Sequence, residues 1–400
     1  MQREELSGWL RLALTPGVGP AAARRLLAAF GLPETLFAQG AAALRQVVGN
    51  AQAEALRAEP PGFAEQLDAC WRWLHEAAPG TLRRVLTLAD ADYPKALLQI
   101  EDPPLLLYLL GAAKSEGKMP EAQSDPSLSA TNSIAIDERR SLAIVGSRNP
   151  TPQGARHARA FARALAEAGL TIVSGLALGI DAEAHLGALE GAAPGDARLA
   201  TIAVVGTGLD RVYPKKNLQL AHRIAQHGLL LSEFPLGTPP LAANFPRRNR
   251  LIAALAQGTL VVEAALQSGS LITARLAAEQ GKEVFAIPGS IDSTQSRGCH
   301  ALIRQGAKLV ETAQDVLEEL RFGGAATPRA EAHDGAPPEN LTAAQQELLA
   351  ALGHEPVGLD ALQARTGLAT PALQAALLEL ELAGVVGRLP GGLFQRIGRA

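Results

Sequence analysis

Cationic side chains lie beside a set of glycine- and serine-rich turns between Ser141 and Gly289. Each turn follows a short apolar run and opens into a helical pattern, as in SLAIVGSRNP, TIVSGLALGIDAEAH, TIAVVGTGLDRVYPKKN and VVEAALQSGSLITA. In a parallel sheet, such turns present backbone N–H groups to anions. We therefore predict a phosphate-binding surface with these cations beside the turns: Arg148, Lys215, Arg247, Arg248 and Arg250.

The turn residues form the second part of the predicted site. They are Gly146, Ser147, Ser174, Gly175, Gly206, Ser268, Gly269 and Ser270. Ser268 or Ser270 is expected to cap a helix whose first N–H groups bind an anion without a charged side chain. Arg148 could instead be a surface ion-pair partner, although its place at the mouth of a glycine turn favours anion binding.

The segment FPRRNRLIAAL places Arg247, Arg248 and Arg250 at an expected helix start. Lys215 and Lys216 precede another expected helix, which opens through Asn217. Exposed cations at a helix N-terminus oppose the macrodipole at a cost of about 0.3–1 kcal/mol each. A bound anion would neutralise them, whereas Lys216 alone is better explained by solvation.

One pair of residues in the sequence could act in catalysis. Asp181 and His185 share one helix face and could form a dyad, but a helix cap and a core histidine explain them better. The chain has no G-x-x-x-x-G-K-[ST] motif, no H-E-x-x-H motif, no metal-spaced cluster and no dinucleotide-binding G-x-G-x-x-G. We therefore expect a binding protein with no catalytic residues, no metal and no cofactor.

Bulk composition sets limits on the partner and the compartment. The net charge of −3 means that any nucleic-acid site must be a local basic patch. Cys70 and Cys299 are far apart, which fits a reducing compartment and argues against a disulfide scaffold or a zinc site. The N-terminus does not resemble a signal peptide and no apolar stretch reaches bilayer length, so we expect a cytoplasmic protein without a membrane partner.

Four parts of the chain differ in pattern. Residues 1–78 predict helices, with Gly17 and Gly19 in a helix-hairpin-helix turn that could hold a DNA phosphate or simply pack on its neighbour. Residues 82–322 predict an α/β domain, with a disordered insertion at 112–140. Residues 323–340 predict a linker, and 341–400 predict a winged helix. Its expected recognition helix, 370–383, carries Glu379 and Glu381 but no Lys or Arg, which favours a packing or partner-binding role.

Strand and helix patterns alternate regularly after Ser141. We expect strands near 142–146, 171–174, 201–205, 229–232, 259–263, 283–287 and 307–310, after an earlier strand-like run at 103–111. Helices are expected near 152–168, 180–190, 215–227, 248–256, 270–280, 298–305 and 313–321. Apolar runs with little alternation suit strands covered on both faces. The fold class is therefore α/β, with a doubly wound, mainly parallel sheet and ligands beyond the carboxyl ends of the strands.

The ordered motifs IVGSR, SGLALGIDAEAH, VVGTGLD-x-x-YP-x-x-N, SEFP, FP-x-RNR-x-I, VVEA-x-x-x-SGSLITA and VFAIPG resemble the DNA-processing protein A family (DprA, or Smf) over about 90–315. The resemblance implies a Rossmann-like domain, a SAM-like N-terminal domain and a winged helix. It implies a non-enzymatic protein that binds and protects incoming single-stranded DNA, loads RecA during natural transformation and forms homodimers. It makes Arg148 the leading DNA contact. In the same groove it places Lys215, Asn217, Phe245, Arg247, Arg248, Asn249 and Arg250.

Two other functions were weighed. Phosphoribohydrolases of the lysine-decarboxylase-like type carry P-G-G-x-G-T-x-x-E, but alignment on Thr273 puts Leu276 at the glutamate position. A transcription regulator would need a basic recognition helix. For single-stranded DNA, Tyr213 and Phe245 offer aromatic faces, and phosphate contacts are expected to dominate affinity.

Overall fold

The computed structural model describes residues 1–77, 80–112, 136–193, 198–322, 341–353, 356–389 and 392–396. The expected insertion at 112–140 falls mostly outside the described residues, and the expected linker at 323–340 falls entirely outside them.

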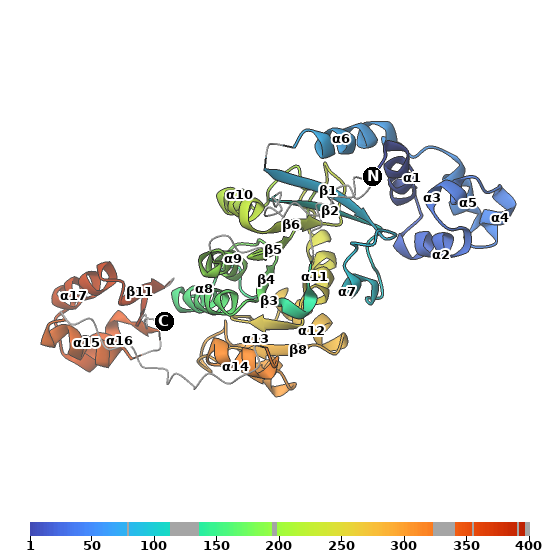
Figure 1. Ribbon diagram of the computed structural model, residues 1–400. Helices are drawn as coiled ribbons and strands as arrows, with labels where there is room; N and C mark the ends of the chain where they lie inside the picture. The colour runs from blue at the N-terminus through green and yellow to red at the C-terminus, as the bar shows by residue number, and fades with distance from the viewer. Residues whose placement is uncertain are drawn as a thin grey trace, which may run out of the picture.

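A nine-stranded sheet forms the centre of the described chain (Figure 1). Its order is β1-β2-β6-β5-β4-β3-β7-β8-β9. Pairing from β6 through β9 is parallel, whereas β2 pairs antiparallel with both β1 and β6. The strands are β1 Thr81–Thr87, β2 Leu106–Ala112, β3 Ser141–Val145, β4 Thr171–Ser174, β5 Thr201–Val204, β6 Leu229–Ser232, β7 Gly258–Val261, β8 Glu283–Ala286 and β9 Lys308–Leu309. The expected mainly parallel α/β sheet is confirmed.

Both faces of the sheet are buried, because side chains of each strand alternate between two helical layers. In β3, Leu142 and Ile144 pack with α8 and α9, while Ala143 and Val145 pack with α11 and α12. The helices after β3 are α8 Pro152–Glu167, α9 Ile180–Gly191, α10 Leu218–His227, α11 Asn244–Ala254, α12 Ser270–Glu279, α13 Arg297–Arg304 and α14 Ala313–Glu319. Shorter turns are α7 Lys95–Leu98, η1 Glu138–Arg140 and η2 Lys215–Asn217.

The chain reverses its direction across the sheet between β3 and β7. It runs from β3 through β4 and β5 to β6, and then returns to β7 on the other side of β3. The loops that follow β3 and β7 therefore run in opposite directions from the carboxyl edge, and a crevice forms between them. A ligand site is expected at this switch point.

The N-terminal helices pack at the β1 end of the sheet (Figure 1). They are α1 Arg3–Leu14, α2 Pro20–Phe30, α3 Pro33–Phe37, α4 Ala41–Arg45, α5 Asn50–Arg57 and α6 Phe63–His75. Gly17, in the turn between α1 and α2, has a φ of +76°, which favours glycine. Trp9 of α1 and Trp73 of α6 are buried in the same cluster as Tyr108 of β2.

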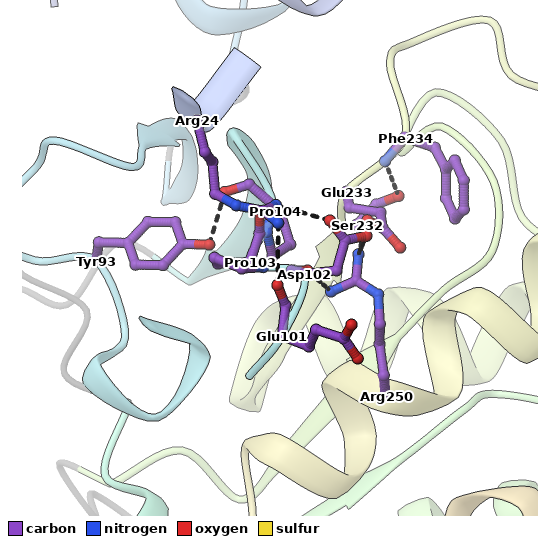
Figure 2. A network of polar contacts seen from close by, with 10 residues as sticks. All are labelled: Arg24, Tyr93, Glu101, Asp102, Pro103, Pro104, Ser232, Glu233, Phe234 and Arg250. Carbon is purple, nitrogen blue, oxygen red and sulfur yellow. Dashed lines mark hydrogen bonds and ion pairs between the residues drawn. The ribbon is translucent and has the colours of Figure 1, made fainter. Parts of the chain in front are cut away.

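Arg24 of α2 joins the helical part to the α/β part (Figure 2). Its guanidinium donates to Asp102 Oδ1 at 2.7 Å, to the Glu101 carbonyl at 2.9 Å and to the Pro103 carbonyl at 3.3 Å. These acceptors lie just before β2. Arg24 is therefore a structural tie between the two parts.

The C-terminal segment has the expected winged-helix pattern. Its elements are α15 Ala343–Leu352, β10 Val357–Gly358, α16 Leu359–Thr366, α17 Thr370–Leu382, β11 Val386–Leu389 and β12 Leu393–Arg396. The three strands pair in the order β10-β12-β11, and the helices share a core of leucines with Val386 and Phe394. Among the described residues, no helix combines the length and apolarity needed to cross a membrane.

His185 of α9 is a core histidine, as the sequence favoured. The Thr201 hydroxyl donates to the Ile172 carbonyl at 2.6 Å, so it accepts from His185 Nδ1–H at 2.7 Å. In the described chain no group bonds His185 Nε2. Burial, with a smaller effect from Arg248, lowers the pKa of His185 to about 3. The imidazole is thus neutral and does not pair with Asp181.

Arg24→Ala is expected to lower the free energy of unfolding by about 1–3 kcal/mol, since it removes three hydrogen bonds, two of them partly buried. Urea denaturation followed by tryptophan fluorescence measures the change. Arg25→Ala, at the exposed neighbouring position, is the control and should stay within about 0.5 kcal/mol of the parent. Equal losses in the two variants would contradict the role of Arg24 as a tie.

Acid is expected to destabilise the fold through His185. Its folded pKa of about 3 is below the ordinary value of 6.5, so between these pH values only the unfolded chain binds the proton. The free energy of unfolding should therefore fall as pH drops below 6.5, by about 1.4 kcal/mol per pH unit for this one group. His185→Leu should flatten the stability-versus-pH curve, whereas His222→Gln, at an exposed position, should not. The same slope in His185→Leu as in the parent would refute this assignment.

Candidate nucleic-acid interface

A pocket of about 530 Å³ lies at the switch point between β3 and β7. We call it the switch-point pocket. Eight of the expected site residues line it: Gly146, Ser147 and Arg148 after β3, Arg248 and Asn249 of α11, and Ser268, Gly269 and Ser270 at the start of α12. The structure therefore brings the first and last glycine turns, far apart in sequence, to one place.

The turn after β3 is held tightly against α9. Ser147 Oγ accepts from the Asn149 amide at 3.1 Å, and the Ser147 carbonyl accepts from the Ile180 amide at 3.0 Å. A Cβ on Gly146 would lie 2.7 Å from Ile180 Cγ1 and 2.9 Å from the Glu263 carbonyl oxygen. Only glycine fits at this position, so the turn and the backbone beyond it are fixed before any ligand binds.

The turn before α12 presents a helix N-terminus to the same pocket. Gly269 is the N-cap and supplies no side-chain acceptor, while Ser268 Oγ accepts from the Ser270 amide at 3.3 Å. The hydroxyls of Ser268 and Ser270 are 2.7 Å apart, and Asn249 Nδ2 donates to the Gly269 carbonyl at 3.3 Å. The amides of Ser270, Leu271 and Ile272 are bonded within this turn, so α12 favours an anion in the pocket through the positive end of its dipole.

Arg148 is exposed at the mouth of the pocket. Its guanidinium carbon is 5.6 Å from the centre of the Phe245 ring, within cation–π range. The Phe245 and Tyr213 rings are 5.6 Å apart and inclined by 38°, and Tyr213 is 47% exposed. Lys215 is exposed two residues beyond Tyr213. In the described chain neither Arg148 nor Lys215 has a carboxylate within ion-pair distance. We call these four residues the aromatic strip.

Arg248 is buried, contrary to the expectation of a groove contact. Its guanidinium donates to the Gly175 carbonyl at 2.5 Å and to the Val204 carbonyl, at the ends of β4 and β5. Burial lowers its pKa to about 10, and the nearby Asp181 carboxylate opposes that shift. A Cβ on Gly175 would overlap this guanidinium, so Gly175 serves packing. Arg248 stays charged at neutral pH and lies at the inner wall of the pocket.

Arg250 lies outside the switch-point pocket. Its guanidinium pairs with the Glu233 carboxylate and donates to the Asp102 carbonyl, and its side chain is 13% exposed. Arg247 is exposed, but it lines a different pocket beside Phe234. The physical reason is that α11 begins at Asn244, so these arginines lie within the helix. Successive helical residues point about 100° apart and cannot face one groove.

Three other expected residues, Asn217, Ser174 and Gly206, stabilise the fold through hydrogen bonds or close packing. Asn217 Nδ2 donates to the carbonyls of Leu176 at 3.0 Å and Ala177 at 3.1 Å. Ser174 Oγ donates to the Ile144 carbonyl at 2.7 Å inside the sheet. A Cβ on Gly206 would lie 3.1 Å from the Phe245 ring. None of the three lines the switch-point pocket, although Gly206 lets Phe245 approach the sheet.

Several pocket residues were not expected from the sequence. They are Asn149, Asp181, Gln267, Thr273 and Gln295. Asp181 is buried and accepts from the Ala177 amide at 3.3 Å. Burial raises the pKa of this carboxyl, against the charge of Arg248. Its place after a glycine turn was visible in sequence, but its position across the sheet edge from α12 was not.

Comparison with known proteins agrees with this architecture. The family model described as DNA recombination-mediator protein A matches residues 119–321, and that of the DprA winged helix domain matches residues 331–392. Protein Smf from Escherichia coli strain K12 is 44% identical over 316 residues, covering 78% of this chain and 77% of the relative. Protein Smf from Synechocystis is 35% identical, covering 99% and 100% of the two chains.

The X-ray structure of DNA processing protein A from Streptococcus pneumoniae also matches. It gives a TM-score of 0.58 at 34% identity, covering 81% of this chain and 99% of that chain. The resemblance inferred from the seven ordered motifs is thereby confirmed. The chain belongs to the DNA recombination-mediator protein A family, also called DprA or Smf, and carries that family's winged helix domain.

Proposed function

We propose that this protein binds single-stranded DNA along the carboxyl edge of its sheet, with one phosphate in the switch-point pocket and bases on the aromatic strip. The observation that carries the proposal is Arg148. It is exposed, lacks a carboxylate partner among the described residues, and stands between the N-terminus of α12 and the ring of Phe245. An unpaired cation between the positive end of a helix and an aromatic face is suited to a nucleotide.

The pocket supports phosphate binding through fixed groups. Gly269 has open space where a side chain would stand, so its backbone allows close approach, and Ser147 and Ser268 supply hydroxyls at the rim. The positive end of the α12 dipole and the Arg148 and Arg248 charges favour an anion. Asp181 partly offsets them, so a single phosphate suits this pocket better than a dense anionic surface.

The aromatic strip supports a preference for single strands. A base can stack on Tyr213 only when its face is free, and duplex bases are already stacked on their neighbours. The 47% exposure of Tyr213 leaves a ring face open to a base, while Phe245 supports the ring from the other side. Stacking uses the face of a base and needs no hydrogen bond to its edge. Binding through this contact should therefore tolerate any DNA sequence.

A non-enzymatic role is part of the proposal. Asp181 accepts a hydrogen bond from the Ala177 amide and interacts with the charge of Arg248. His185 is hydrogen-bonded to Thr201. Neither side chain is arranged as a base beside a nucleophile. The pocket then retains its ligand and does not transform it.

Family membership extends the proposal to partners. We propose that the protein protects incoming single-stranded DNA in the cytoplasm, loads RecA onto it during natural transformation and acts as a homodimer through its Rossmann-like domain. We also propose domain limits of 1–78, 82–322 and 341–400. Glu379 and Glu381 lie on α17, and their negative charge disfavours contact with duplex DNA. We therefore propose that the winged helix packs within the protein or binds a partner protein.

Arg148→Ala is expected to weaken binding of a single-stranded oligonucleotide roughly five- to thirtyfold, because it removes one phosphate contact and the cation over Phe245. The slope of log K against log salt should become shallower by about 0.7. Filter binding across a salt series measures both. Arg163→Ala removes the same charge from an exposed α8 position paired with Glu167, and it should bind like the parent. Equal behaviour of the two variants would remove the proposed site.

Tyr213→Ala is expected to weaken single-strand binding by about 1–3 kcal/mol, the usual value of one base stacked on an aromatic ring. Tyr213→Phe keeps the ring and should retain most of the affinity. The measurement is a competition between single-stranded and duplex oligonucleotides of one sequence. The alanine variant should lose discrimination against the duplex. Full discrimination in Tyr213→Ala, or a loss as large in Tyr213→Phe, would show that stacking does not select the strand.

A further inference from the structure

A second pocket, of about 300 Å³, lies between the α1–α2 turn and the end of β6. We call it the hairpin pocket. Its walls are largely apolar: Val18, Pro20, Leu105, Phe234 and Pro235 contribute from three separate segments. The only charged side chains among its lining residues are Glu233 and Arg247. A flat apolar cleft with one acid and one base is suited to a ring that carries polar edges.

Glu233 lines the hairpin pocket and has one carboxylate oxygen without a hydrogen-bond donor in the described part of the chain. Its side chain is 7% exposed, and Oε2 is bonded to Arg250 (Figure 2). Oε1 is buried, and no donor among the described residues reaches it. A buried acceptor without a donor destabilises the free protein, so a ligand that supplies an N–H group is favoured.

Arg247 gives the hairpin pocket a second polar group. Its guanidinium carbon is 5.8 Å from the centre of the Phe234 ring, and the side chain is exposed. The positive charge of Arg247 interacts electrostatically with the Glu233 carboxylate. Arg247 therefore can meet a phosphate at the rim while Glu233 meets a donor further inside. A nucleotide carries both groups, a phosphate and a base with N–H donors.

We propose that the hairpin pocket takes one base of the bound DNA strand and prefers a base with an exocyclic amino group, such as cytosine, over thymine. This inference rests on the proposed binding of single-stranded DNA. Carboxylates accept from the cytosine N4 amino group, whereas thymine carries at that ring position O4, an acceptor that the carboxylate repels, and can donate only from its ring N3–H. Glu233 Oε1 is the group that distinguishes them.

The two pockets lie along one edge of the sheet. Glu233 follows β6 and Arg148 follows β3, and β5 and β4 separate these two strands. Three strand spacings correspond to roughly 14 Å. The aromatic strip lies beside Gly206, which follows β5, and so falls between the pockets. A short single strand could therefore occupy both.

The test compares short oligo-dC and oligo-dT of equal length by fluorescence anisotropy at pH 7.5. The parent protein should bind oligo-dC roughly tenfold more tightly. Glu233→Gln should remove this preference and keep the affinity for oligo-dT. Asp102→Asn is the matched control, because Asp102 Oδ2 lies 3.8 Å from Arg250 but Asp102 does not line the hairpin pocket. It should retain the preference.

An arm on the DNA side avoids any effect of mutation on folding. Oligonucleotides of N4,N4-dimethylcytosine lack the amino donor and should bind the parent protein no better than oligo-dT. Equal affinity of the parent for oligo-dC and oligo-dT would overturn the base preference and leave the single-strand proposal standing. A preference that survives both Glu233→Gln and N4-dimethylation would overturn the assignment to Glu233. Failure of both oligonucleotides to bind would overturn the two proposals together.

Discussion

The Arg248 guanidinium is buried between α11 and the carboxyl ends of β4 and β5, where it donates to the Gly175 and Val204 carbonyls. Asp181 balances its charge. Separating a buried charge from its partners costs several kcal/mol, so α11 cannot rotate freely against the sheet. Other side chains at the start of this helix are directed accordingly: Phe245 meets Gly206, and Asn249 reaches the turn before α12.

Because the orientation of α11 is fixed, the three arginines near its start have different surroundings. Arg247 is exposed beside Phe234, Arg248 supports the sheet edge, and Arg250 pairs with Glu233 near the N-terminal helices. Fewer cations are therefore free than the sequence suggests, which agrees with a net charge of −3. Affinity for a polyanion then depends on a few phosphate contacts supplemented by stacking, and such a balance favours flexible single strands over the stiff duplex.

The sequence predicted the parallel strands well, because apolar runs with no alternation leave few other structures open to them. It also predicted the switch-point turns, whose glycines are required by close packing at Gly146. It missed β1, because Arg83 and Arg84 interrupt the apolar pattern; in the structure they bond to the Trp73 carbonyl and to Asp92. It wrongly placed Arg250 in the groove, and it did not anticipate that Arg248 would be buried at the inner wall of the switch-point pocket. The helix of that segment was expected from about residue 248 but begins at Asn244, and the burial of each arginine depends on β4, β5 and β6, which are distant in sequence.

The central claim is that a DNA strand lies across the carboxyl edge of the sheet, between the switch-point pocket and the aromatic strip. Photocrosslinking with a single-stranded oligonucleotide that carries 5-iodouracil, followed by mass spectrometry of the peptides, tests it directly. Crosslinks are expected at Tyr213 and Phe245, and unlabelled single strands should compete for them whereas duplex should not. Crosslinks confined to α17 of the winged helix, or to the amino edge of the sheet, would contradict it.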